Sequence, residues 1–139
     1  MFSVAYATIQ DKPYWYSLDR HMPKSEYELK VRDRRCYMIR DNEKPVGILR
    51  YNLFWDMIPF LTLIYFEEAR RRQGFGAKAM AHWESEMRAL GHKMAMTSTM
   101  ANEKAQFFYR KLGYKDMGCL VMNTPPYEQP LEVFLGKGL

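Results

Sequence analysis

The alternation of apolar and polar residues along the chain predicts about seven strands. An apolar run fits a strand over residues 2–9, and two more runs on either side of Asp41–Lys44 predict a hairpin within residues 35–54. A further run at residues 58–66 would complete an antiparallel meander with this hairpin. Shorter runs at residues 93–99, 114–122 and 131–137 fit the remaining strands.

Helical spacing of apolar residues predicts four helices between these strands. Residues 14–21 and 24–33 fit two short helices that are parted at Pro23, with Ser25 opening the second. A longer helix ends before Gly91 and has one apolar face. That face is formed by Met80, Trp83, Met87 and Leu90.

The last predicted helix lies within residues 102–114. Asn102 is expected to cap its start and Gly113 to end it. Its inner face is expected to consist of Ala105, Phe108 and Leu112. The elements follow one another in the order β-α-α-β-β-β-α-β-α-β-β, with no internal repeat and no linker. This order predicts an α/β fold in a single domain, residues 1–139, with a mixed, mostly antiparallel sheet of about seven strands flanked by four helices.

Charge, cysteine and histidine content narrow the partners and the compartment. The net charge of +5 suggests an anionic partner, and leaves both phosphate ligands and nucleic acid open. Cys36 and Cys119 lack a C-x-x-C spacing, which predicts free thiols and a cytoplasmic location. No window reaches the roughly 18 apolar residues that span a bilayer, so no membrane segment is expected. His21, His82 and His92 lack the spacing of metal ligands, so no metal site is expected.

A basic, glycine-containing segment precedes the long helix. Residues 67–80, EEARRRQGFGAKAM, place three arginines and two glycines at its start, where the first N–H groups of a helix have no intrahelical acceptor and attract anions. Gly74 and Gly76 remove the Cβ atoms that would keep a phosphate away, and Arg71 and Arg72 add charge. A tight turn beside solvated arginines is the alternative. The segment lacks the G-x-x-x-x-G-K-[ST] pattern of a P-loop and the third glycine of a dinucleotide-binding fold.

Two motifs occur in a fixed order along the chain. Residues 71–76, RRQGFG, fit the pattern Q/R-x-x-G-x-G/A after the fourth strand. Residues 102–114, NEKAQFFYRKLGY, fit the pattern N-x-x-A-x-x-F-Y-x-x-x-G-F/Y. Together they resemble the signatures of the GNAT acetyltransferase superfamily, over nearly the whole chain. The resemblance implies a GNAT-like domain that uses acetyl-coenzyme A (acetyl-CoA) as co-substrate and needs no metal.

The resemblance also implies roles for individual positions. The backbone amides of residues 71–77 would hold the pyrophosphate, and the backbone of residues 64–66 would pair with the pantetheine arm. Asn102 resembles a residue that steadies this arm, and Tyr109 resembles the general acid that protonates the CoA thiolate. The expected cofactor-binding residues are Ile64, Tyr65, Phe66, Arg71, Arg72, Gln73, Gly74, Phe75, Gly76, Ala77, Asn102, Ala105, Phe108 and Tyr109.

The general base is the point at which the chain departs from better-known members of the family. Their glutamate on the fourth strand corresponds to Phe60, so Asp56 or Glu67, or the adjacent Glu68, is expected to serve, with a water chain or merely solvated carboxylates as alternatives. A phenol with a pKa near 10 can protonate a thiolate whose parent thiol has a pKa near 8.5. Simple packing of the Tyr109 ring is the alternative to that role.

In the family, the first helices and the edges of the third and fourth strands build the acceptor pocket. The lining residues expected here are Tyr14, Trp15, Asp19, Asn52 and Trp55, with Tyr16, His21 and Asp56 beside them. Aromatic rings and carboxylates suit a cationic amine, on a small molecule or a peptide. Core packing is the alternative for Trp15 and Tyr16.

We therefore expect an N-acetyltransferase that passes the acetyl group of acetyl-CoA to a primary amine by direct attack in a ternary complex. A non-catalytic CoA-binding or protein-interaction module on the same fold is the alternative, since the glutamate of the fourth strand is missing. Nucleic-acid binding ranks last, because the basic residues do not interleave with aromatic residues along one strand face. The apolar final strand, residues 131–136, is a candidate for sharing with a second copy in a homodimer.

Overall fold

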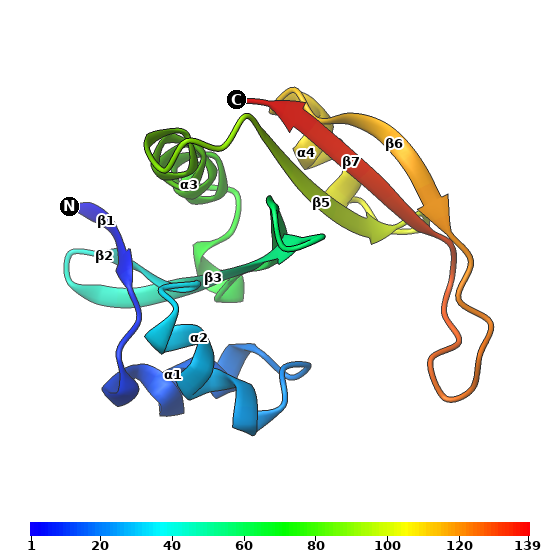
Figure 1. Ribbon diagram of the computed structural model, residues 1–139. Helices are drawn as coiled ribbons and strands as arrows, with labels where there is room; N and C mark the ends of the chain where they lie inside the picture. The colour runs from blue at the N-terminus through cyan, green and yellow to red at the C-terminus, as the bar shows by residue number, and fades with distance from the viewer. The chain divides into compact units, whose positions relative to one another are not determined.

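The computed structural model describes residues 1–139 and contains seven strands and four helices (Figure 1). Along the chain they are β1 (Phe2–Tyr6), α1 (Lys12–Leu18), α2 (Tyr27–Arg32), β2 (Cys36–Asp41), β3 (Lys44–Phe54), β4 (Ile58–Phe66), α3 (Phe75–Ala89), β5 (Met94–Met100), α4 (Ala105–Lys111), β6 (Lys115–Leu120) and β7 (Glu132–Gly138). The strand order in the sheet is β1-β2-β3-β4-β5-β7-β6. Strands β4 and β5 pair in parallel, whereas β1–β2, β2–β3, β5–β7 and β6–β7 are antiparallel. The predicted fold class and order of elements are confirmed.

The chain divides into two compact units. Unit 1 consists of residues 1–52 and 62–85, and unit 2 consists of residues 53–61 and 86–139. Strands β3 and β4 and helix α3 therefore contribute residues to each unit. Each unit buries its own set of apolar side chains.

Unit 1 contains the hairpin of β2 and β3. Its two strands are antiparallel, with Met38 opposite Ile48. The turn between them consists of Asn42 and Glu43, whose φ angles of 51° and 70° are the left-handed values that match a tight turn to twisted strands. The hairpin predicted around Asp41–Lys44 is confirmed.

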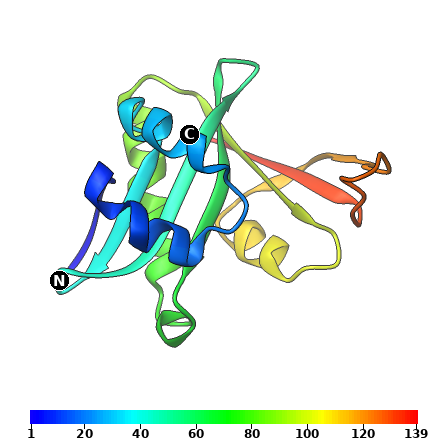
Figure 2. The same cartoon turned by 90° about the horizontal axis from the view of Figure 1, so that it is seen from below.

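Helices α1 and α2 cover one face of the unit 1 sheet (Figure 2). Their largest side chains, Trp15 and Tyr27, are fully buried with ring centres 5.7 Å apart, and they belong to one apolar cluster with Ile48 of β3. Trp83 of α3 packs against Tyr51, which points to the opposite face of β3 because strand residues alternate in direction. Burial of such a side chain stabilises the fold by about 1.5–3 kcal/mol.

Unit 2 is built around β7, which lies between β5 and β6. Leu135 of β7 is buried and stands opposite Thr97 of β5 and Asp116 of β6. Both edges of β7 are paired within its own chain, so this strand has no free edge for a second copy, and the homodimer expected from residues 131–136 stays a prediction. The edge strand here is β6, and all six of its residues are exposed.

Strand β1 and helix α2 differ from their predicted limits. Strand β1 ends before Thr8, which starts a 3₁₀ turn, η1 (Ile9–Asp11), and donates its amide to the carboxylate of the turn's last residue at 2.8 Å. Helix α2 begins at Tyr27, after a second 3₁₀ turn, η2 (Lys24–Glu26). Ser25 therefore lies inside that turn and does not cap the helix.

Helices α3 and α4 also differ from prediction at single residues. Leu90 is 61% exposed, because the helix has already ended and the amide of His92 bonds back to the carbonyl of Met87. Tyr109 is the buried residue of α4, although Ala105, Phe108 and Leu112 had been expected on its inner face. Asn102 lies in the exposed turn before α4 and does not cap it.

Candidate active site

The loop between β4 and α3 combines a left-handed backbone with open space. After the 3₁₀ turn η3 (Glu68–Arg70), Arg72 has φ 62° and Gly74 has φ 81°. A Cβ atom added at Gly74 would meet no other atom within 4 Å, so the space in front of this residue is open. A side chain there would be strained by the backbone and would intrude on that space.

The backbone amides of this loop and of the first turn of α3 are unbonded. The first amide that finds a helical acceptor is that of Lys78, which donates to the carbonyl of Gly74 at 3.2 Å. The amides of residues 72–77 donate to no acceptor in the protein. Such a set of free N–H groups at a helix start, with the positive end of the helix dipole behind it, favours an anion.

The side chains of the loop are held in different ways. Arg71 donates from Nε to the carbonyl of Phe66 at 3.2 Å, and its guanidinium lies 4.8 Å from the ring centre of Tyr65. Gln73 donates to the carbonyl of Ala69 at 3.1 Å. Arg72 is exposed and has no hydrogen-bond or ion-pair partner, so it is the loop arginine whose donors are all free.

Phe75 anchors the start of α3 in the interior of unit 1. Its side chain is 9% exposed, with its ring centre 5.6 Å from that of Phe2 and 6.4 Å from that of Phe66. Gly47 allows this packing, since a Cβ at that position would lie 2.5 Å from the Phe66 ring. Phe75 is one of the predicted cofactor-binding residues. Because its side chain is packed inside, it can contact the cofactor only through its backbone amide.

Tyr109 of unit 2 is buried beside a polar neighbour. It is 7% exposed, and burial raises its pKa to about 12, although a hydrogen bond with the side chain of Thr97 acts in the opposite direction. Thr97 in turn donates to the carbonyl of Leu61 at 3.0 Å. Tyr109 is thus a neutral phenol over the whole physiological range, and a weaker acid than the sequence predicts.

The other predicted residues of unit 2 lie near the surface. Asn102 and Ala105 are exposed, and Phe108 is half-buried with its ring centre 5.2 Å from that of Tyr109. Trp55 and Asp56 occupy the turn between β3 and β4, both with positive φ and both exposed.

The candidate bases have different environments. Glu67, at the end of β4 in unit 1, accepts a hydrogen bond of 2.7 Å from the hydroxyl of Tyr14 in α1. Burial and the neighbouring Glu67 carboxylate raise the pKa of Tyr14 above its ordinary value. Asp56 of unit 2 is exposed and has no such partner. Of the two candidate bases, Glu67 is therefore the one whose carboxylate is held by a hydrogen bond.

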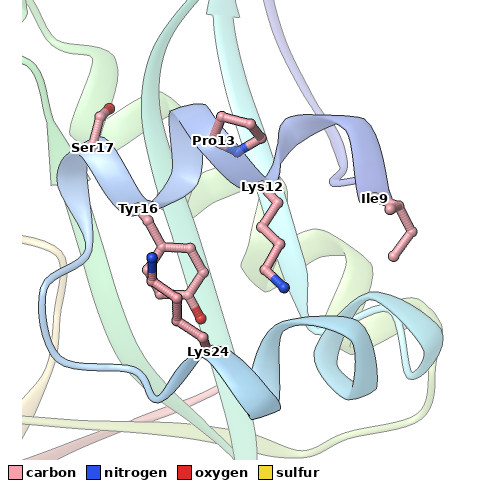
Figure 3. A pocket seen from close by; sticks show the side chains of 6 residues that line it. All are labelled: Ile9, Lys12, Pro13, Tyr16, Ser17 and Lys24. Carbon is pink, nitrogen blue, oxygen red and sulfur yellow. The ribbon is translucent and has the colours of Figure 1, made fainter.

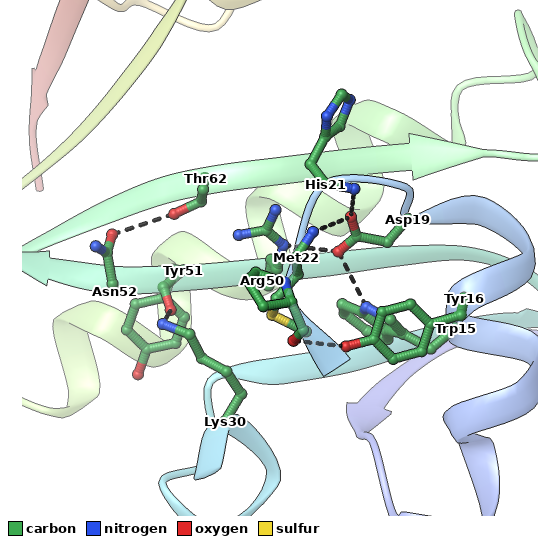
Figure 4. Close-up of polar contacts among 11 residues, drawn as sticks. Trp15, Tyr16, Asp19, His21, Met22, Lys30, Arg50, Tyr51, Asn52 and Thr62 are labelled. Atoms are coloured by element: carbon green, nitrogen blue, oxygen red, sulfur yellow. Dashed lines mark hydrogen bonds and ion pairs between the residues drawn. The ribbon is translucent and has the colours of Figure 1, made fainter. Parts of the chain in front are cut away.

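Trp15 and Asp19 are interior residues. Asp19 is 1% exposed and accepts hydrogen bonds from Trp15 Nε1 at 3.0 Å and from Arg50 Nε at 2.8 Å, and the amides of His21 and Met22 donate to its other oxygen (Figure 4). Trp15 packs in the core and the Asp19 carboxylate is satisfied by four donors, so neither of these predicted pocket residues is open to solvent.

Arg50 is the residue of this cluster that sequence reasoning missed. It lies in β3 on the same face as Ile48, whose side chain points into the core, and Arg50 is 9% exposed. A signal was present in the sequence, since a cation on the inward face of an apolar strand requires a carboxylate partner. The sequence did not indicate that Asp19 would be that partner.

An open groove of about 610 Å³ lies beside α1 in unit 1 (Figure 3). Its lining residues are Ile9, Lys12, Pro13, Tyr16, Ser17 and Lys24. Lys12 is paired with Glu28 at 2.9 Å, and the ammonium group of Lys24 lies 5.2 Å from the ring centre of Tyr16. Tyr16 is the only residue of this lining that the sequence placed at the acceptor pocket.

No group of three or more His, Cys, Asp or Glu side chains is arranged to hold a metal ion. Cys36 is buried and Cys119 is exposed, and both thiols are free. No helix combines the length and the apolar content that crossing a bilayer requires.

Comparison with known proteins relates these features to one family. The model of the Acetyltransferase (GNAT) family matches residues 3–114. No protein with a curated description matches the chain.

Solved structures of the same fold are distant in sequence. Ard1 from Thermoplasma volcanium has a TM-score of 0.83 at 14% identity, over 99% of this chain and 97% of that one. The ribosomal-protein-S18-alanine N-acetyltransferase from Escherichia coli has a TM-score of 0.79 at 18% identity, over 99% and 94% of the two chains. Arabidopsis thaliana Naa50, in complex with the bisubstrate analogue CoA-Ac-MVNAL, has a TM-score of 0.79 at 12% identity, over 99% of both chains.

Proposed function

Because the chain belongs to the acetyltransferase (GNAT) family, we propose that it transfers the acetyl group of acetyl-CoA to a primary amine by direct attack in a ternary complex. The observation that carries this proposal is the row of unbonded amides at residues 72–77. A diphosphate offers the oxygen atoms that these donors lack. The free guanidinium of Arg72 and the open space at Gly74 add charge and room for it.

The chemistry requires two proton transfers that residues of this chain are suited to make. Acetyl-CoA supplies a thioester, and the amine nitrogen forms a bond to its carbonyl carbon while the bond from carbon to sulfur breaks. The amine loses a proton, and Glu67 is the candidate that receives it, with exposed Asp56 or a water chain as alternatives. The departing sulfur gains a proton, and Tyr109 is the candidate donor. Its neutral state at physiological pH supports this role.

The acceptor is proposed only as a class, an amine on a small molecule or a peptide. The E. coli neighbour is named for acetylation of an alanine of ribosomal protein S18, and the A. thaliana neighbour is bound to a CoA–peptide analogue. These names support an amine at a protein N-terminus as one acceptor to test.

We also propose that residues 1–139 act as one catalytic domain. The free thiols of Cys36 and Cys119 support a cytoplasmic location.

A non-catalytic CoA-binding module is the second candidate, and one observation favours it. Phe60 occupies the position of the strand-four glutamate, and its ring centre lies 6.1 Å from that of Phe54 and 5.8 Å from that of Phe134. The position is therefore apolar and holds no base. Under this candidate the chain binds CoA but does not release it from acetyl-CoA.

Thermal unfolding with acetyl-CoA, followed by a CoA-release assay on an amine panel, tests the proposal. At 100 times its Kd the ligand should stabilise the native state by about 2.7 kcal/mol and raise Tm by several degrees. Arg72→Ala should weaken this shift, whereas Arg88→Ala, at an exposed arginine in the last turn of α3, should not. An unchanged Tm at saturating acetyl-CoA would refute binding, and binding without CoA release from any amine would favour the second candidate.

A further inference from the structure

Arg50 uses one of its five N–H donors within the protein. Its single hydrogen bond runs from Nε to Asp19, and its side chain is 11% exposed. Figure 4 shows the two terminal nitrogens on the side of the strand toward Asn52 and Thr62, with no dashed line to any of the residues drawn. Trp83 Nε1 is the one fully enclosed side-chain N or O atom without a partner, so the terminal nitrogens of Arg50 keep access to solvent.

Asp19 fixes the orientation of Arg50 without cancelling all of its charge. The Asp19 carboxylate is shared among four donors, and only one of them belongs to Arg50. Burial lowers the pKa of Lys30, and the charges of Arg35 and Arg50 add to that effect. The Arg50 guanidinium therefore still acts on Lys30 as a positive charge, and its hydrogen bond to Asp19 fixes the orientation of its planar group.

Asn52 adds donors on the same face of β3. It lies two residues beyond Arg50, which places both side chains on one face about 7 Å apart along the strand. The hydroxyl of Thr62 donates to Asn52 Oδ1 at 3.1 Å, which leaves the amide NH₂ group of the exposed Asn52 as a free donor. Arg50 thus presents donors only and Asn52 presents a free NH₂ group, and their natural complement is a group with several acceptor oxygens.

We propose that Arg50 and Asn52 bind a carboxylate carried by the acceptor amine. The inference rests on the proposed function and narrows its substrate class from amines in general to amines that bear a carboxylate. A carboxylate has two coplanar oxygens that match the two terminal nitrogens of an oriented guanidinium. The same group exists as the α-carboxylate of a free amino acid and as an acidic side chain or C-terminus of a short peptide.

Matched probe pairs test the inference with the protein saturated with CoA. Free amino acids are compared with their α-amides, and dipeptide amides with aspartate or glutamate at the second position are compared with their asparagine or glutamine counterparts, by calorimetry and by CoA release from acetyl-CoA. We expect each acid to bind about 10- to 100-fold more tightly than its uncharged partner, the range for a charged hydrogen-bonded pair. A preference confined to the first comparison identifies an amino acid, and one confined to the second identifies an acidic peptide. Equal binding within both comparisons, or no binding at all, would overturn the inference.

Variants at Asn52 test the site without touching the buried pair. Asn52→Asp places a negative charge at an exposed position and should raise KM for the acid about 10-fold relative to KM for its amide. Asn123→Asp, the same change in an exposed loop residue, is the matched control and should leave both values unchanged. Arg50→Lys keeps the charge but loses the fork, and should abolish most of the preference for acids over amides. An Asn52→Asp variant whose acid and amide KM values change together would contradict the proposal.

Failure of this inference differs from failure of the proposed function. If the chain does not release CoA from acetyl-CoA with any amine, the proposed function fails, whatever the calorimetry shows. If CoA is released equally from reactions with acids and with amides, the function stands and the inference about Arg50 fails. Calorimetry with the CoA-bound protein measures carboxylate binding without turnover, so the two results are read independently.

Discussion

Unit 1 buries Asp19 and unit 2 buries Tyr109. The first is an ionised carboxylate at neutral pH, and the second is a neutral phenol. Burial alone would raise the pKa of Asp19, but the His21 amide, the Arg50 charge and the Met22 amide outweigh it, so its pKa lies below the usual range. Tyr109 has one hydrogen-bonding neighbour, Thr97, and burial raises its pKa to about 12. The two groups start from different intrinsic pKa values, near 3.9 for a carboxyl and near 10 for a phenol. Their surroundings then widen the gap, because the donors around Asp19 lower its pKa whereas burial raises that of Tyr109.

This difference in ionisation suits the two buried groups to different roles, one in positioning and one in proton transfer. An ionised carboxylate with four donors has no free lone pair left for a reaction, so Asp19 is suited to hold Arg50 in place. A neutral phenol keeps its proton and can donate it to the departing sulfur; because a thiolate is a weaker base than the phenolate, this transfer depends on the position of the two groups. Four predictions test this contrast, beginning with the largest effect.

Removal of the Asp19 carboxylate should destabilise the chain severely. Asp19→Ala leaves Arg50 buried without a counter-charge, and we expect the free energy of unfolding to fall by about 3–5 kcal/mol in urea titrations. Glu28→Ala removes the surface partner of Lys12 in the same unit and should cost less than about 1 kcal/mol. Similar losses in the two variants would show that the buried pair is no stronger than a surface pair.

Tyr109→Phe should affect turnover far more than stability. Loss of the proton donor is expected to lower kcat about 100-fold, while loss of one hydrogen bond lowers the free energy of unfolding by about 1 kcal/mol. Tyr127→Phe, at a tyrosine that is 70% exposed, is the control and should change neither quantity. If kcat for Tyr109→Phe equals that of the native chain, the ring serves only to pack.

Alkaline pH should weaken the fold through Tyr109. A folded-state pKa near 12, above the unfolded value near 10, gives stability that is complete below pH 10 and is lost as pH rises from 10 to 12. Between pH 9 and pH 11 the free energy of unfolding should fall in the native chain by on the order of 1 kcal/mol more than in Tyr109→Phe. If the unfolding free energies of the two proteins change with pH in parallel, the loss of stability at alkaline pH comes from other tyrosines.

Acid should weaken the fold through Asp19, with the smallest of the four effects. Its lowered pKa gives stability that is present above about pH 4, the unfolded value, and is lost as pH falls below it through the folded pKa. Asp19→Asn removes this titration, so its unfolding free energy should depend less on pH between pH 4 and pH 2. An unchanged slope would mean that other carboxylates account for acid unfolding.

The parts of the structure that follow from short-range sequence patterns were predicted well. The hairpin around Asp41–Lys44, the order of eleven elements and the loop before α3 all depend on residues close together in the chain. The motif of residues 71–76 belongs to the same class, because the turn, the glycines and the helix start are contiguous.

Contacts between distant segments were beyond sequence reasoning. The partners Asp19 and Arg50 are 31 positions apart, and the hydrogen bond from Tyr14 to Glu67 spans 53 positions. The same limit applies to the place of β7 between β5 and β6, which depends on pairing across the sheet. The pKa of Tyr109 was missed because burial depends on three-dimensional packing, which a helix motif does not specify.

The central place of β7 in unit 2 has a consequence for biosynthesis. The ribosome completes β5 and β6 before Glu132–Gly138 emerges, yet each of these strands finds an antiparallel partner only in β7. A nascent chain must therefore carry both strands without this partner until translation has passed this segment, and unpaired strand edges favour aggregation. Slow translation upstream of residue 132, or a stop codon there, should yield aggregated chains rather than a smaller folded protein.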